Sequence, residues 1–265
     1  MTTPARCRTG VVDVLLVVGG RWHDLDFARR ELLALVGAHD AVRCTVREDF
    51  SDLDVISRAD AILAYTCDVR PTPEQSSALL ARVAEGARLL ALHATNSALD
   101  APAPGGERLF TLPDVSAGFV ALLGSRFLAH PKIGPAYIEV CQPDDPLVQG
   151  VGSFTTTDEV YVCEWAADID VLLDTALTGP CPGFPTTDVA LGARLPVLYR
   201  RTEGLGSVVY FTLGHCRGRF DVQDLGIDDL GHTDRIAWES AQYRAVLARC
   251  VDWAVHGDNE CEEAA

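Results

Sequence analysis

Four segments of the sequence end in a histidine: Gly-Gly-Arg-Trp-His23, Leu-Ala-Leu-His93, Phe-Leu-Ala-His130 and Thr-Leu-Gly-His215. Three of these histidines directly follow short, apolar runs that are typical of buried strands. Imidazole carries protons near neutral pH and is the commonest metal ligand in proteins. In an open parallel α/β sheet, ligands bind at the carboxyl ends of the strands. The histidines therefore predict acid–base or metal chemistry at one edge of a sheet.

Other residues offer alternative chemistry. Asp158 and Glu159 are adjacent and precede an apolar segment. Because neighbours in extended backbone point to opposite faces, we expect one of them to orient a histidine or to bind substrate hydroxyls. Cys67 and Cys216 are candidates for a thiolate nucleophile, since Cys67 follows a predicted strand and Cys216 is next to His215.

Glycine patterns argue against a nucleotide cofactor. Gly19-Gly20 follows a predicted strand but lacks the dinucleotide-binding fingerprint, and the sequence has no P-loop. Gly204-Leu205-Gly206 precedes a strand instead of opening a helix, which predicts a hairpin turn.

The elements that must position the histidines are predicted most clearly in the first half of the chain. Helical spacing predicts a helix over Leu25–Val36, and Thr72, Pro73 and Gln75 predict the start of a second helix that ends near Gly86. The predicted strands are Val11–Val18, Ala41–Val46, Asp60–Tyr65 and Arg88–Leu92. Because these strands are apolar throughout, we expect helices on both faces of a parallel sheet.

The second half is richer in predicted strands. A long stretch rich in proline and glycine, Ala101 to Pro135, is expected to contain one short helix at Val115–Leu123, and a final helix is expected over Trp238–Val255. The predicted strands are Ala136–Cys141, Val160–Glu164, Val171–Ala176, Pro196–Tyr199 and Ser207–Leu213. We expect one domain over residues 11–257, with flexible termini at 1–10 and 258–265.

Composition narrows the class of protein. The 265 residues include 22 basic and 38 acidic side chains, a net charge of -16, which argues against nucleic-acid binding. The sequence has no apolar run long enough to cross a membrane and no signal peptide pattern, so we expect a cytoplasmic protein. Its nine cysteines are scattered and odd in number, which argues against a disulfide framework or a zinc knuckle.

Several motifs, in this order, carry a family resemblance. They are Leu92-His93-Ala94, Gly124-Ser125-Arg126-Phe127 with His130-Pro131, Asp158-Glu159-Val160-Tyr161, and the segment from Pro196 to His215. With these motifs the chain resembles the trehalose-utilisation (ThuA-like) family of the class I glutamine amidotransferase-like superfamily. The resemblance implies a flavodoxin-like three-layer α/β sandwich with a mostly parallel central sheet. True amidotransferases have a nucleophilic cysteine at a strand-to-helix elbow, where this chain has His93.

The resemblance also implies carbohydrate processing, often of oxidised (3-keto) glycosides. A 3-keto group acidifies the neighbouring carbon–hydrogen bond, so a histidine base can remove that proton and the glycosidic oxygen can leave. A divalent metal such as Zn or Mn would polarise the ketone. We therefore predict a metal-assisted lyase, hydrolase or isomerase that acts on a small carbohydrate-like molecule.

The predicted roles divide as follows. His23, His93 and His215 are metal-ligand candidates, His93, His215, His130, Asp158 and Glu159 are catalytic candidates, and Arg126 and Tyr161 are substrate-binding candidates. Which histidine holds metal and which moves protons is left open, as is a homo-oligomeric state. The alternatives are a non-catalytic domain that binds a carbohydrate or another small ligand, and an amidotransferase-like hydrolase with a cysteine nucleophile.

Overall fold

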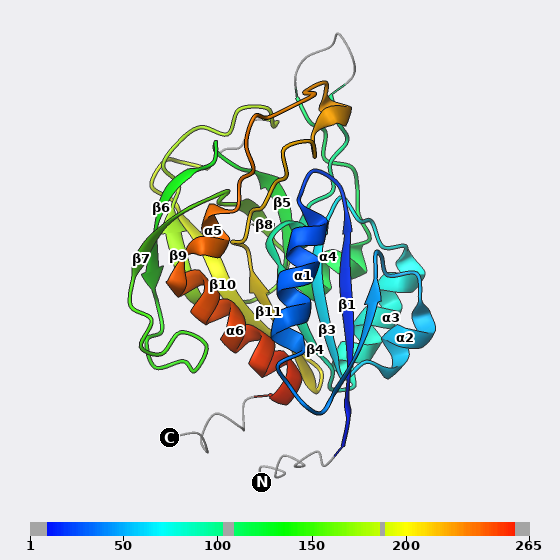
Figure 1. Cartoon of the computed structure of the whole chain (residues 1–265). Coiled ribbons are helices and arrows are strands. Elements are labelled where there is room, and N and C mark those ends of the chain that lie inside the picture. The colour runs from blue at the N-terminus through cyan, green and yellow to red at the C-terminus, as the bar shows by residue number, and fades with distance from the viewer. Residues whose placement is uncertain (1–9, 103–108, 186–188, 258–265) are drawn as a thin grey trace.

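The computed structural model describes residues 10–102, 109–185 and 189–257 (Figure 1). Within these residues, nine strands form one sheet in the order β2-β1-β3-β4-β11-β10-β9-β6-β7, while β5 and β8 pair with each other. The strands are β1 (Val12–Gly20), β2 (Val42–Arg47), β3 (Ala61–Cys67), β4 (Arg88–Leu92), β5 (Ser125–Ala129), β6 (Gly134–Val140), β7 (Phe154–Asp158), β8 (Val162–Trp165), β9 (Asp170–Ala176), β10 (Arg194–Glu203) and β11 (Gly206–Phe211). The termini predicted to be flexible lie outside the described residues, apart from Gly10.

Helices connect the parallel strands. The helices are α1 (Leu25–Val36), α2 (Leu53–Arg58), α3 (Pro73–Ala84), α4 (Ala117–Leu123), α5 (Ile236–Glu239) and α6 (Ala241–His256), with short 3-10 turns η1 (His93–Asn96) and η2 (Gln223–Leu225). The predicted start of α3 is confirmed, because Thr72 and Gln75 form a reciprocal capping box.

Two apolar layers explain why β1 is apolar throughout. Val14, Leu16 and Val18 belong to one core cluster, which also takes in the buried faces of α1 and α6. Leu15 and Val17 point to the other side and join a second cluster with residues of α2, α3 and α4. Helices therefore cover both faces of the parallel strands, as Figure 1 shows.

The sheet is more mixed than the sequence predicted. Strands β2, β1, β3, β4 and β11 run parallel, whereas β10, β9, β6 and β7 are joined by antiparallel pairing. The predicted hairpin at Gly204-Leu205 is confirmed, since it joins β10 to β11. Hairpin connections need no crossover helix, so the second half of the chain adds antiparallel strands.

Three sequence predictions need correction. The stretch from Ala101 to Pro135 contains β5 as well as the predicted helix, so His130 directly follows a strand. The strand predicted over Val160–Glu164 begins at Val162, and Asp158 instead ends β7. The final helix is broken at Ser240, whose extended backbone and side-chain oxygen cap α6.

Candidate functional site

His23 is held at the carboxyl end of β1 by close backbone contacts. Gly20 has a φ of 105°, and a Cβ there would lie 1.7 Å from the carbonyl oxygen of Cys67. The amide of Arg21 donates to that same carbonyl at 3.0 Å, and the amide of Asp24 donates to the carbonyl of Cys216 at 3.0 Å. The glycine is therefore required by close packing of two strand ends, and the segment it begins places His23 inside the protein.

His93 occupies a strained elbow between β4 and η1. Its φ is 44°, in the left-handed region that residues with a Cβ rarely adopt. The Tyr210 hydroxyl donates to its carbonyl oxygen at 2.8 Å, and its ring Nδ1 lies 2.9 Å from the carbonyl oxygen of Thr212. These contacts fix both the backbone and the ring of a fully buried side chain.

Asp158 positions the segment that carries His215. Its carboxylate accepts hydrogen bonds from the amides of Gly214 at 2.7 Å and His215 at 3.1 Å. Burial raises the pKa of Asp158 to about 6, although these backbone donors act in the opposite direction. Both neighbouring carboxylates therefore contact His215: Asp158 binds its backbone amide, and Glu159 lies 3.5 Å from its ring Nδ1.

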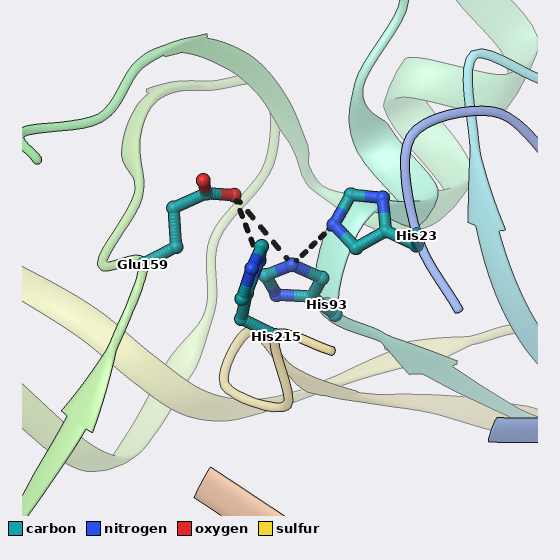
Figure 2. Close-up of side chains that lie close together, drawn as sticks. All are labelled: His23, His93, Glu159 and His215. Carbon is teal, nitrogen blue, oxygen red and sulfur yellow. Dashed lines mark hydrogen bonds and ion pairs between the residues drawn. The ribbon is translucent and has the colours of Figure 1, made fainter. Parts of the chain in front are cut away.

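Four buried side chains from distant parts of the sequence meet at this edge of the sheet: His23, His93, Glu159 and His215 (Figure 2). The Nε2 atoms of His23 and His93 are 2.9 Å apart. The Oε2 atom of Glu159 lies 3.5 Å from His215 Nδ1 and 3.7 Å from His93 Nε2. One nitrogen or oxygen atom from each residue lies within 4.8 Å of the others. We call these four residues the histidine–glutamate cluster.

Charge in the cluster is uneven. Burial lowers the pKa of His23, and it lowers the pKa of His93 to about 3 against the opposing effect of Glu159. Both rings are therefore neutral near pH 7. Burial alone would raise the pKa of Glu159, but nearby His130, His215 and Arg217 hold it well below its usual range. The cluster thus combines the neutral imidazoles of His23 and His93 with a carboxylate, the protonation states that bind divalent metals.

Hydrogen bonding shows which ring nitrogens hold lone pairs. Nδ1 of His93 faces the Thr212 carbonyl, and Nδ1 of His23 faces the Arg21 carbonyl at 3.2 Å. A carbonyl only accepts, so these contacts favour the tautomers with the proton on Nδ1 and a lone pair on Nε2. Neither ring nitrogen of buried His215 has a hydrogen-bond partner among the described residues. Without a cation, the cluster contains buried acceptors that face each other.

His130 and Tyr161 line a cavity of about 190 Å³ beside the cluster, as do His23 and Glu159 of the cluster itself. His130 Nε2 is 3.4 Å from Glu159 Oε1, and its Nδ1 contacts the Pro131 carbonyl at 2.7 Å. The Tyr161 hydroxyl lies 3.1 Å from His93 Nε2 and 3.3 Å from Glu159 Oε2. Burial raises the pKa of Tyr161, so its hydroxyl remains a hydrogen-bond donor.

Four predicted site residues do not line the cavity: His93, Arg126, Asp158 and His215. Arg126 was a substrate-binding candidate, but its guanidinium donates to the carbonyls of Leu112 and Pro113 at 3.1 and 3.2 Å. It alternates along β5 with Phe127, which lines the cavity, so Arg126 points to the opposite face. His93 and His215 contact the cavity only through other members of the cluster, since neither lines it.

The two candidate nucleophilic cysteines are buried. Burial raises the pKa of Cys67, and it raises the pKa of Cys216 to about 12. The Cys216 sulfur lies 3.1 Å from the Tyr65 hydroxyl. Because the thiolate is the nucleophilic form, these surroundings disfavour a cysteine mechanism at neutral pH.

Sequence reasoning missed several residues at the site. Arg217 lies 3.9 Å from Glu159, and its Nε donates to the Trp22 carbonyl at 2.9 Å. Ser97 lines the cavity, and its buried hydroxyl has no partner among the described residues. Phe184 also lines the cavity. None of these positions follows an apolar strand pattern, so only three-dimensional packing identifies them.

The fold and the cluster define an α/β protein with a buried histidine–glutamate site at the carboxyl ends of its parallel strands. Residues 13–225 match the ThuA family model, described as trehalose utilisation, and the chain belongs to this family. The family resemblance in the sequence is thereby confirmed. No curated protein matches the chain.

Solved structures with the same fold include two putative ThuA-like proteins. The one from Bacteroides uniformis ATCC 8492 has a TM-score of 0.63 and 16% identity over 96% of each chain. The one from Parabacteroides merdae ATCC 43184 has a TM-score of 0.60 and 16% identity over 94% of this chain and 91% of its own. A cytoplasmic protein from Salmonella typhimurium LT2 has a TM-score of 0.53 and 12% identity, over 92% of this chain and 100% of its own.

None of the helices in the described residues has the length and apolar character needed to cross a membrane.

Proposed function

We propose that this ThuA-family protein is a carbohydrate-processing enzyme that cleaves or isomerises a keto-sugar or keto-glycoside by metal-assisted histidine chemistry. The observation that carries the proposal is the contact between His23 Nε2 and His93 Nε2 at 2.9 Å. Two lone pairs at that separation repel each other unless a cation or a proton lies between them. A cation, unlike a proton shared by these two rings, would also bind a ring nitrogen of His215, and neither ring nitrogen of that buried residue has a hydrogen-bond partner among the described residues. Leaving a buried polar group unpaired costs about 1–3 kcal/mol, which supports a bound cation.

The donor set fits a divalent metal. Ligand atoms bound at about 2.1 Å to one ion are separated by roughly 3.0–3.4 Å, close to the separations of 2.9, 3.5 and 3.7 Å in the cluster. His23, His93, His215 and Glu159 would hold the ion, and three imidazoles with one carboxylate suit Zn²⁺ or Mn²⁺. The carbonyls behind His23 and His93 fix those rings, as carbonyls commonly do for metal-bound histidines.

The proposed reaction on a 3-keto glycoside is redox-neutral. A base removes the proton on the carbon between the ketone and the anomeric carbon, and the electron pair moves onto the ketone oxygen. Return of that pair forms a carbon–carbon double bond and expels the glycosidic oxygen, which takes up a proton as the free alcohol. Water can then add across the double bond, so that the net result is hydrolysis. A bound divalent ion would supply positive charge beside the ketone oxygen.

His130 is the residue best placed to move the proton. It lines the cavity, lies outside the four proposed metal ligands, and has Nδ1 in contact with the Pro131 carbonyl and Nε2 3.4 Å from Glu159 Oε1. Glu159 beside it can orient the ring. The Tyr161 hydroxyl lines the same cavity and can donate a hydrogen bond to an oxygen that gains negative charge.

The proposal also includes the fold class, the cellular location and the size of the substrate. Helices on both faces of the parallel strands support a flavodoxin-like three-layer sandwich. The structural neighbour from Salmonella typhimurium LT2 is named a cytoplasmic protein, which supports a cytoplasmic location for this chain. We infer a small carbohydrate-like substrate, because the cavity beside the cluster holds about 190 Å³.

Metal analysis combined with turnover tests the proposal. The purified protein is expected to bind one equivalent of Zn²⁺ or Mn²⁺ and to release the alcohol from a 3-keto-glucoside. His215→Ala is expected to lose the metal and the turnover. His130→Gln is expected to keep the metal and to lose at least about a hundredfold in kcat, whereas His232→Gln, at an exposed histidine, serves as the matched control.

Three results would contradict the proposal in different ways. Absence of metal binding at millimolar Zn²⁺ or Mn²⁺ would show that the cluster does not hold the metal ion that the proposal requires. Metal and sugar binding without turnover of any keto-glycoside favours a non-catalytic binding domain. Turnover that resists chelators but is abolished by thiol alkylation favours a cysteine nucleophile.

A further inference from the structure

One wall of the cavity is a continuous row of aromatic rings that begins at the cluster. Tyr161, which contacts His93, packs edge-on against Phe127 at 4.8 Å between ring centroids. Phe127 packs against Phe184 at 5.4 Å, and Phe184 stacks on Phe110 at 5.6 Å with an interplanar angle of 20°. Trp22 extends the row, at 5.6 Å from Phe110. The row therefore extends from the proposed reaction centre along the lining of the cavity.

A second part of the lining, called the aliphatic wall, comes from the segment between Arg217 and Asp234, whose ends are joined by a β-bridge. Val222, Leu225 and Leu230 of this segment line the cavity. The Asp224 carboxylate accepts a hydrogen bond from the indole of Trp22 at 3.0 Å, which ties the aliphatic wall to the aromatic row. The aromatic row and the aliphatic wall thus make much of the cavity lining apolar.

Polar groups among the described lining residues are gathered near the cluster. His23, His130, Glu159, Tyr161 and Arg217 lie there, all within one or two contacts of Glu159. The Ser97 hydroxyl is a further polar group in the lining, and it is buried without a partner among the described residues. These groups are enough to bind one sugar ring with its keto group and hydroxyls.

A second sugar in the cavity would be poorly matched. Its hydroxyls would face Phe110, Phe184 and the aliphatic side chains, which offer no hydrogen bonds. Each buried hydroxyl without a partner lowers affinity by about tenfold. A flat apolar group would instead stack on the aromatic row and exclude water from both walls.

We propose that the substrate is a glycoside whose aglycone is an apolar ring system, with the sugar at the cluster and the aglycone against the aromatic row and the aliphatic wall. The inference rests on the proposed function, because it assigns the polar end of the cavity to a reacting sugar. It predicts discrimination against disaccharides, in which the group beyond the reacting sugar is another sugar.

Calorimetry with unoxidised ligands tests this preference without requiring turnover. The probes are methyl β-glucoside, cellobiose and 2-naphthyl β-glucoside, which share one sugar and differ in the group attached to it. The naphthyl probe is expected to bind the metal-loaded protein with a Kd at least about tenfold lower than that of cellobiose.

Variants locate the preference in the aromatic row. Phe184→Ala is expected to weaken naphthyl binding at least about fivefold and to change methyl glucoside binding less than about twofold. Phe184→Leu, which keeps apolar surface and volume, is expected to retain most of the affinity. Phe220→Ala is the matched control, because Phe220 belongs to the same segment as the aliphatic wall but is 55% exposed and does not line the cavity.

The inference is overturned if cellobiose binds as tightly as the naphthyl probe, if Phe220→Ala has the same effect as Phe184→Ala, or if no probe binds. The 3-keto forms of the same probes then test the reaction separately. Selective naphthyl binding without turnover of any keto form would contradict the proposed function and leave the binding preference intact.

Discussion

The left-handed backbone at His93 predicts that a glycine variant is more stable than an alanine variant at this position, the reverse of the usual order. A Cβ at a φ of 44° costs about 1–2 kcal/mol. Glycine avoids that cost, but it loses about 0.5–1 kcal/mol more backbone entropy on folding than alanine does. We therefore expect His93→Gly to be more stable than His93→Ala by about 1 kcal/mol.

Comparing the two variants isolates the contribution of the left-handed backbone at residue 93 to the free energy of unfolding. Both remove the imidazole, its contact with the Thr212 carbonyl and the proposed metal ligand, so those losses cancel. Urea unfolding in the presence of a chelator measures the difference. With a slope of about 3 kcal/mol per molar urea, the midpoint of His93→Gly is expected to lie about 0.3 M above that of His93→Ala.

An exposed site in a regular helix provides the control. At Ser77 in α3, alanine is expected to be more stable than glycine by about 1 kcal/mol, the ordinary order. If His93→Ala proves more stable than His93→Gly, the elbow is not left-handed and the argument for how His93 is aimed fails.

Two further predictions concern the cluster. Metal affinity is expected to fall less than about tenfold from about pH 7.5 to 5.5, because the lowered pKa values keep His23 and His93 neutral. Two histidines with ordinary pKa values would lower the affinity about a hundredfold over the same range. A hundredfold fall in a calorimetric titration would refute this prediction. Asp158→Asn is expected to lower the unfolding free energy by about 1–3 kcal/mol and to weaken metal binding, because it removes a charged acceptor for the amides of Gly214 and His215. Unchanged metal affinity would show that Asp158 does not position His215.

Local patterns were enough to predict the parallel half of the fold. Strands β1, β3 and β4 are buried on both faces, so their sequences are apolar throughout and stand out from their neighbours. The capping box at Thr72 likewise depends only on residues three apart. Such features can be predicted because they depend only on residues close together in the sequence.

The antiparallel half depends on partners distant in sequence. Strand β7 has the sequence Phe-Thr-Thr-Thr-Asp, and β5 is five residues long with alternating burial. Strand β7 has no apolar run, and the apolar run of β5 is only Phe-Leu-Ala. Strand β7 pairs with β6, and β5 pairs with β8. The apolar lining of the cavity from residues 222–230 has no periodicity that would predict it, because a loop places those side chains.

The geometry divides the predicted catalytic residues into two layers. His93 and His215 follow central strands and were the strongest candidates, yet both are buried behind the cavity. A residue behind the cavity cannot take a proton from a substrate, but it can hold an ion that the substrate approaches. His130 and Tyr161 line the cavity and touch Glu159 or His93 from the outer side. The strand-to-helix elbow at His93 aims an imidazole inward, so under the proposed function proton transfer is assigned to residues on neighbouring segments.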